Sequence, residues 1–222
     1  MTRDRPAPEF DAVILAGGSA ARMGGADKPG LIVGGTPLLV SVAQAAAAAG
    51  AARLIIVGPP RPGDVTASLS ALAAGRPGWL AWVREEPAGG GPVAGLRRGL
   101  AEVSAPWLAV LAADLPFLTG AHLTALLTAG DPEPAAGVVL TDAEGKPQWL
   151  TSCWPTSSLR SALAAYGGDS LHGLLAPLGP ALARLETAAG AMPPWLDCDT
   201  PDDLAAARRA WLANAADSGG AP

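Results

Sequence analysis

The sequence predicts a single α/β domain in which helices cover both faces of a mostly parallel β-sheet. Short, almost wholly apolar runs alternate along the chain with longer segments of helical pattern, which is typical of parallel strands joined by helical crossovers. The chain has 222 residues, half of them hydrophobic, which suits one domain with a sizeable core. We expect this domain to span residues 10–214, between a disordered lead-in at 1–9 and a disordered tail at 215–222.

The first part of the chain supplies most of the expected strands. They are short runs rich in Val, Ile, Leu and Ala, as parallel strands covered on both faces should be. These runs are residues 10–16, 53–57, 80–83, 107–112 and 137–140. Helices are expected between them, at 37–49, 64–74, 93–103 and from 119 onward. Thr36 is expected to cap the first helix, because a threonine followed by proline is typical of a helix start.

From residue 146 the regular alternation ends. A further strand is expected at 146–154, followed by helices at 156–165 and 170–176, a strand at 181–185 and a last helix at 201–214. Either Asp199 or Thr200 would cap the last helix, with Pro201 at its first position.

A glycine-rich loop follows the first strand and carries two cationic residues. Its glycines stand at positions 17, 18, 24 and 25, and its charges are Arg22 and Lys28. Glycine lets a ligand approach the main chain closely, and successive backbone N–H groups in such a turn bind anions. The loop has neither the G-x-x-x-x-G-K-[ST] nor the G-x-G-x-x-G spacing, but its composition still indicates a phosphate-binding site. In an open parallel sheet, such a site lies outside the carboxyl ends of the strands.

Charge and composition argue against several functional classes. The formal net charge is −5 and the chain has no Lys/Arg cluster, so a general nucleic-acid binder is not expected. No apolar stretch reaches the length of a membrane span, and the first ten residues do not resemble a signal peptide. Cys153 and Cys198 form no C-x-x-C pair and are expected to be reduced, buried thiols. We therefore expect a cytoplasmic protein without a membrane or nucleic-acid partner.

Several stretches together resemble one known family. Residues 15–28, LAGGSAARMGGADK, are similar to the nucleotidyltransferase signature L-A-G-G-x-x-x-R-M-G-x-x-D-K of the molybdenum cofactor guanylyltransferases. Residues 89–96, GGGPVAGL, resemble the family's G-P-L-A-G segment, and residues 112–117, AADLPF, match its D-x-P pattern. The match is partial at 147–154 and at 197–203, where DCDTPDD replaces N-x-N-T-P-E-D. The resemblance implies a Rossmann-like, three-layer nucleotidyltransferase fold.

The resemblance also implies which residues form the site. Arg22, Lys28 and Asp114 would be catalytic, and Asp114 would bind Mg²⁺ together with Asp199. The nucleotide-binding residues would be Leu15, Ala16, Gly17, Gly18, Arg22, Lys28, Gly91, Pro92, Gly95 and Asp114. From the residues alone, an aspartate after a strand suits the oxygen-preferring Mg²⁺, but Asp114 could instead form a turn before proline. Asp199 could be a helix cap, and Asp197 is a lesser candidate for the metal.

The implied reaction is the transfer of GMP from Mg-GTP to the phosphate of molybdopterin, with release of pyrophosphate and formation of the guanine dinucleotide cofactor. Molybdoenzymes or other cofactor-biosynthesis proteins would be its partners. Three alternatives stay open: a cytidylyltransferase, another phosphorylated acceptor, and a non-catalytic nucleotide-binding module. The cytidylyltransferase relatives tend to have L-A-A-G, so Gly17 favours guanine. Trp149 or Trp154 could stack on a pterin ring or simply pack in the core.

Overall fold

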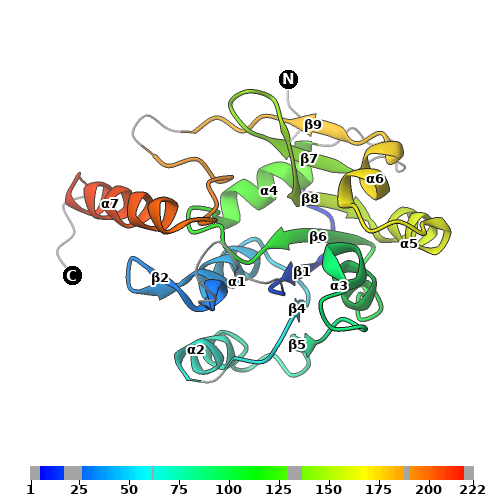
Figure 1. Ribbon diagram of the computed structural model, residues 1–222, viewed down its shortest axis with the longest axis horizontal. Coiled ribbons are helices and arrows are strands. Elements are labelled where there is room, and N and C mark those ends of the chain that lie inside the picture. The colour runs from blue at the N-terminus through cyan, green and yellow to red at the C-terminus, as the bar shows by residue number, and fades with distance from the viewer. Residues whose placement is uncertain (1–5, 18–26, 62, 130–136, 188–190, 218–222) are drawn as a thin grey trace.

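A seven-stranded sheet forms the centre of the molecule, in the strand order β5-β4-β1-β6-β8-β7-β9 (Figure 1). A computed structural model describes residues 6–17, 27–61, 63–129, 137–187 and 191–217. The strands are β1 (Phe10–Leu15), β4 (Leu54–Val57), β5 (Leu80–Val83), β6 (Trp107–Ala112), β7 (Val138–Thr141), β8 (Pro147–Pro155) and β9 (Ala181–Ala183).

The sheet is mostly parallel, as predicted. Strands β5, β4, β1 and β6 pair in parallel, as do β7 and β9. Strand β8 is antiparallel to both β6 and β7. It reverses direction because the chain leaves β7 through a tight turn instead of a helical crossover. In that turn Gly145 donates its backbone N–H to the Asp142 carbonyl at 3.1 Å, and Glu144 donates to the Asp142 carboxylate at 3.1 Å.

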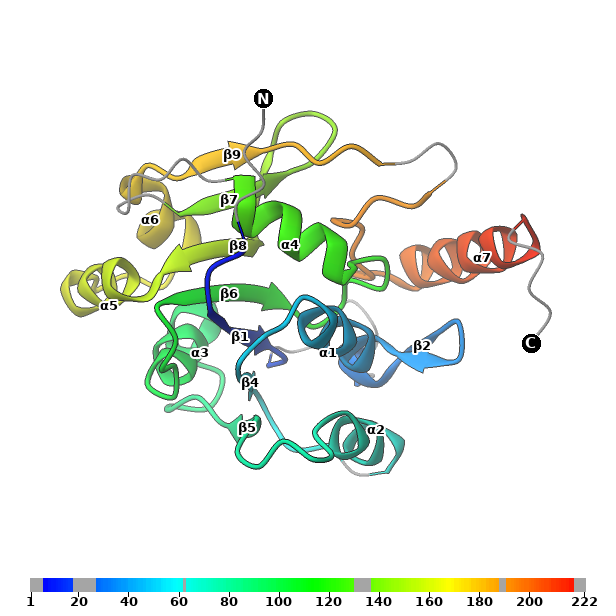
Figure 2. The same cartoon turned by 180° about the vertical axis from the view of Figure 1, so that it is seen from behind.

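Helices cover both faces of the sheet and complete the three predicted layers (Figures 1 and 2). The helices are α1 (Leu38–Ala48), α2 (Asp64–Leu72), α3 (Gly91–Leu100), α4 (Gly120–Ala129), α5 (Thr156–Ala165), α6 (Leu171–Leu175) and α7 (Pro201–Asp217). Helices α1, α2 and α4 share one buried cluster with alternate β1 residues such as Ala12 and Ile14. Helices α3, α5 and α6 share the other with Val13. Among the described residues, no helix is both long enough and apolar enough to cross a membrane.

The expected start of the first helix is wrong. Thr36 and Pro37 form the short strand β3, which pairs antiparallel with β2 (Ile32–Val33), and α1 begins at Leu38 without a side-chain cap. Gly34 and Gly35, with φ of 59° and 78°, form the two-residue turn of this hairpin. Such a turn requires positive φ at both positions, which glycine adopts freely, so the local glycine pair overrides the Thr-Pro helix signal.

The last helix lies against this hairpin. Helix α7 contacts β2, and the Arg208 Nε donates to the Ile32 carbonyl at 2.9 Å. It continues to Asp217, three residues into the stretch expected to be a disordered tail. The rest of that tail, like most of the lead-in, lies outside the described residues. Both cysteines are buried and free, and burial raises the pKa of the Cys153 thiol.

Candidate active site

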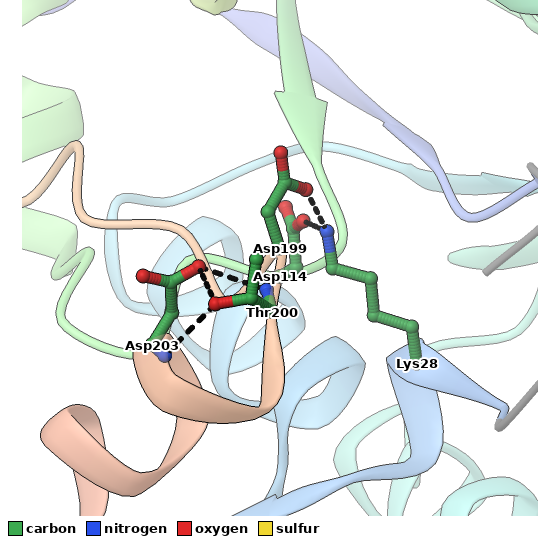
Figure 3. Close-up of polar contacts among 5 residues, drawn as sticks. All are labelled: Lys28, Asp114, Asp199, Thr200 and Asp203. Carbon is green, nitrogen blue, oxygen red and sulfur yellow. Dashed lines mark hydrogen bonds and ion pairs between the residues drawn. The ribbon is translucent and has the colours of Figure 1, made fainter. Parts of the chain in front are cut away.

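Three segments that are distant in sequence meet at the carboxyl end of the sheet (Figure 3). Strands β1 and β6 pair so that Leu15 lies opposite Ala112, and the loops that follow them therefore begin side by side. Lys28 lies in the short 3-10 helix η2 (Lys28–Gly30) that comes after β1, and Asp114 follows β6 by two residues. The third segment is the chain just before α7, which brings Asp199 to the same place.

Lys28 is held between two carboxylates. Its ammonium group forms an ion pair with Asp114 and another with Asp199 (Figure 3). Burial lowers the pKa of Lys28, but the hydrogen bonds and charges of Asp114 and Asp199 outweigh burial and raise this pKa above its ordinary value. Because that ordinary value is already far above neutral pH, Lys28 carries a permanent positive charge in the site.

A cluster of carboxylates surrounds this charge. Asp114, Asp197 and Asp199 each offer an oxygen, and these oxygens lie within 4.8 Å of one another. Burial, reinforced by the charges of Asp199 and Asp114, raises the pKa of Asp197. Mg²⁺ prefers oxygen ligands, and carboxylates also supply negative charge that balances the charge of the ion. The three aspartates therefore fit a Mg²⁺ ion.

Asp199 is available to the site because another residue caps the last helix. The Asp203 backbone N–H donates to Thr200 Oγ1 at 3.2 Å, and the Thr200 backbone N–H donates to the Asp203 carboxylate at 2.8 Å (Figure 3). This reciprocal pair is a capping box. The interpretation of Asp199 as the helix cap is therefore wrong, and its carboxylate faces Lys28 instead.

Cys198, between the two aspartates Asp197 and Asp199, is buried in the core. Its side chain is fully buried in a cluster with Val33, Leu38 and Leu204. Burial raises the pKa of the thiol to about 12, and the charge of Asp114 adds to this effect. Asp197 and Asp199, on either side of the anchored thiol, both line the cavity that contains Lys28.

That first cavity has a volume of about 500 Å³ and combines charged and aromatic walls. Lys28 and the three aspartates lie in it together with Trp149 and Trp195. Trp154 does not reach it, because this side chain is fully buried and donates its Nε1–H to Ser152 Oγ at 2.8 Å. Trp154 is thus a core residue, whereas Trp149 and Trp195 can contact a ligand. The sequence analysis missed Trp195, although an aromatic residue close to Asp197 was a usable signal.

A second cavity of about 370 Å³ adjoins the first, since Leu15, Gly17 and Leu150 line both. Its other lining residues include Gly91, Pro92 and Gly95 at the start of α3. The structure thus brings together eight of the ten residues expected to bind the nucleotide. The eight are Leu15, Ala16, Gly17, Lys28, Gly91, Pro92, Gly95 and Asp114. Gly18 and Arg22 lie outside the described residues.

Two glycines of α3 allow the role of the second cavity to be tested. A Cβ on Gly99 would lie 2.6 Å from Val13 Cγ1 and 2.9 Å from Val57 Cγ2, so Gly99 is needed for packing against the sheet. A Cβ on Gly95 would lie 3.5 Å from Leu15 Cδ2, which is an ordinary contact. Packing therefore does not require Gly95, a residue that lines the second cavity.

We expect Gly95→Ala to raise the free energy of unfolding by about 1 kcal/mol, because alanine is the better helix former. The added methyl group should also weaken nucleoside triphosphate binding by about tenfold, because it enters the cavity. Gly99→Ala is the matched control, and overpacking should destabilise it by about 1–3 kcal/mol. Denaturant unfolding and calorimetric titration with GTP measure the two effects. Unchanged GTP binding in the Gly95 variant would argue against the second cavity as a nucleotide site.

Arg61 lies beside the site, and the sequence analysis missed it. Its guanidinium is buried and donates to Asp27 Oδ1 at 2.7 Å, to the Ala16 carbonyl at 2.8 Å and to the Pro59 carbonyl at 3.2 Å. It thereby links the end of β1 to the residue before Lys28. The available signal was a cationic residue shortly after β4, at the same carboxyl edge of the sheet.

Comparison with known proteins gives a consistent picture. The family described as MobA-like NTP transferase domain matches residues 12–188. The molybdenum cofactor guanylyltransferase of Rhodopseudomonas palustris (strain HaA2) is 32% identical over 218 residues, which cover 92% of each chain. A probable molybdenum cofactor guanylyltransferase of Natronomonas pharaonis is 33% identical over 128 residues, and the match covers 58% of this chain and 60% of that protein.

A solved structure supports the fold. A nucleotidyl transferase from Methanothermobacter thermautotroptrophicus superimposes with a TM-score of 0.73 at 23% identity. The match covers 93% of this chain and 99% of that one. The expected three-layer nucleotidyltransferase fold is therefore confirmed.

Proposed function

The chain belongs to the family of MobA-like NTP transferase domains, and from this premise we propose that it transfers GMP from GTP to the terminal phosphate of a molybdopterin-type acceptor. The product would be a guanine dinucleotide form of the cofactor, and pyrophosphate would be released. The observation that supports this most directly is the position of Lys28, which faces Asp114 and Asp199 in a cavity that adjoins a second one.

The two adjoining cavities suit the two substrates. The smaller one, beside Gly91 and Gly95, would take the nucleotide base, and the larger one would take the triphosphate and the acceptor. Trp149 and Trp195 give the larger cavity aromatic surfaces on which a flat pterin ring can stack. Gly17 lines both cavities. A nucleotide that extends from one cavity into the other would therefore pass a residue that has no side chain.

In the reaction, an oxygen of the acceptor phosphate forms a bond to the α-phosphorus of GTP. The bond from the α-phosphorus to its bridging oxygen breaks, and pyrophosphate leaves with that electron pair. A phosphate monoester is largely ionised at neutral pH, so the site has little need of a general base. The chain's contribution is to position both substrates and to balance their negative charge.

We assign charge compensation to Lys28 and Arg22, and phosphate contacts to the backbone N–H groups of Gly17 and Gly18. Asp114 and Asp199, with Asp197 nearby, would hold Mg²⁺. When bound, this ion neutralises phosphate charge and stabilises the departing pyrophosphate. Enzymes that insert the finished cofactor, or that supply molybdopterin, are the protein partners that such a product implies.

The proposal is tested by incubating the protein with molybdopterin, Mg²⁺ and either GTP or CTP. We expect equal amounts of pyrophosphate and guanine dinucleotide cofactor with GTP, measured by a coupled phosphate assay and by mass spectrometry. Chelation of Mg²⁺ should stop both. Preferential product formation from CTP would contradict the choice of nucleotide. Tight GTP binding without turnover of any phosphorylated acceptor would contradict the assignment as an enzyme.

A further inference from the structure

A buried arginine joins the two ends of the glycine-rich loop. Arg61, shortly after β4, is only 7% exposed, and each of its guanidinium nitrogens donates a hydrogen bond. Its Nη2 donates to the carbonyl of Ala16, where the loop begins, and its Nε forms an ion pair with the carboxylate of Asp27, where the loop ends. A buried charge is costly unless it is paired, and the planar guanidinium holds its partners in a fixed arrangement. The two flanks of the loop are therefore tied together by one side chain.

Arg61 is itself anchored to the body of the sheet. Its backbone carbonyl accepts a hydrogen bond from Thr66 Oγ1 of α2. Just before it in the chain, Gly58 donates its backbone N–H to the Val83 carbonyl of β5 at 2.9 Å. A Cβ on Gly58 would lie 2.8 Å from the carbonyl carbon of Ala16, so this segment is pressed against the start of the loop. The loop is thus tied to a part of the molecule that is fixed by β4, β5 and α2.

Asp27 links this anchor to Lys28. Its Oδ1 accepts from Arg61, and its Oδ2 lies against Gly30, because a Cβ on Gly30 would be only 2.7 Å from that oxygen. Gly30 also donates its backbone N–H to the Asp27 carbonyl at 2.9 Å and so closes the turn that contains Lys28. The Lys28 side chain extends from this turn to its two carboxylate partners (Figure 3). A shift of Asp27 would therefore move the ammonium group.

We propose that Arg61 is a positioning residue for GMP transfer: it holds Asp27 against Ala16 and thereby sets where Lys28 meets the triphosphate. This inference rests on the proposed function, which places the triphosphate beside Lys28. Arg61 lines neither cavity, and its nitrogens are bound to protein oxygens, so it acts through Asp27 and not by touching a substrate. A displacement of about 1 Å in a reacting site can cost about 100-fold in rate.

The test measures binding of inorganic triphosphate with Mg²⁺ to the full chain by calorimetry, since this probe needs neither a base nor an acceptor. Arg61→Lys keeps the charge, but one ammonium group cannot replace a planar guanidinium that binds both flanks. Asp27→Ala breaks the same contact from the other side. The Asp27 side chain is 56% exposed, so its loss should preserve the fold. The matched controls are Arg76→Lys and Asp64→Ala, at exposed residues that line neither cavity.

We expect Arg61→Lys and Asp27→Ala each to weaken triphosphate binding by about tenfold. The double variant should bind no more weakly than the weaker single variant, because both changes break one contact. Gly30→Ala should have the same effect, since its methyl group would displace the Asp27 carboxylate. In GMP transfer, kcat should fall by about 100-fold while KM for the acceptor stays unchanged. A purely structural role would lower the unfolding midpoint without this split, and the controls should match the wild type.

Wild-type triphosphate affinity in Asp27→Ala would overturn this inference and leave the proposed function intact. Fully additive losses in the double variant would do the same, because they would show that Arg61 and Asp27 act separately. If the variants lose triphosphate binding as expected but the wild type forms no product from GTP and molybdopterin, Arg61 still positions Lys28 and only the proposed function is wrong. A wild type that does not bind triphosphate with Mg²⁺ would overturn both.

Discussion

Lys28→Ala is expected to lower the rate of GMP transfer by at least about a thousandfold, the size of effect that a positively charged side chain has on the transition state of phosphoryl transfer. Lys28 is a permanent cation in the first cavity, and its ammonium group is oriented by Asp114 and Asp199. The departing pyrophosphate gains negative charge in the transition state, and a fixed cation stabilises it more than it stabilises bound GTP. The loss should therefore be larger in kcat than in KM.

The control is the chain's only other lysine. Lys146 is exposed, in the turn before β8, and Lys146→Ala should leave the rate unchanged. Thermal unfolding of both variants separates loss of chemistry from loss of fold. Lys28→Arg keeps the positive charge but replaces the compact ammonium group with a planar guanidinium group. It should therefore retain only part of the wild-type activity. A rate for Lys28→Ala within tenfold of the wild type would remove Lys28 from the mechanism.

Much of the fold was predictable because its strands are locally distinct. Strands β5 and β6 and helix α5 were predicted with the bounds that the structure shows. Each is a compact apolar or amphipathic run that ends at a proline, a glycine or a polar turn. The β2–β3 hairpin was missed because Thr-Pro is a strong helix-start signal and the glycine pair acts only through its positive φ.

The site was predictable where a single loop carries the signal. The segment around Gly17 and Lys28 is readable as one motif, and Asp114 as another. Arg61 was not readable, because its contacts depend on strand order: β4 lies next to β1, so the segment after β4 reaches the Ala16 carbonyl at the end of β1. That order is fixed by long-range pairing, which sequence position does not give.

Asp199 shows a different limit of sequence reasoning. Two adjacent residues, Asp199 and Thr200, are both good helix caps, and local propensity does not choose between them. The structure decides through Asp203, which pairs with Thr200 in a capping box and leaves Asp199 to face Lys28. In this short aspartate-rich segment, Asp203 thus stabilises the start of α7, whereas Asp199 places a negative charge beside Lys28.

Asp114→Asn is expected to abolish GMP transfer, again by at least about a thousandfold, because it removes one of the charged ligands that a metal needs near the phosphates. Asparagine keeps the shape and one oxygen, so the fold should survive. The side chain of Asp114 is only 14% exposed and is the most enclosed of the partners of Lys28. Asp199, with 45% exposure, is more open to water and should contribute less to metal affinity.

Mg²⁺ dependence gives a readout that a purely structural role would not change. In the wild type, Mg²⁺ added with GTP should raise the melting temperature, since a ligand that binds only the folded state stabilises it. In Asp114→Asn, half of this rise should need at least about tenfold more Mg²⁺. Asp202→Asn is the matched control, because Asp202 is exposed in the first turn of α7 and does not line the first cavity. Wild-type activity of Asp114→Asn at ordinary Mg²⁺ would show that this carboxylate does not hold the metal.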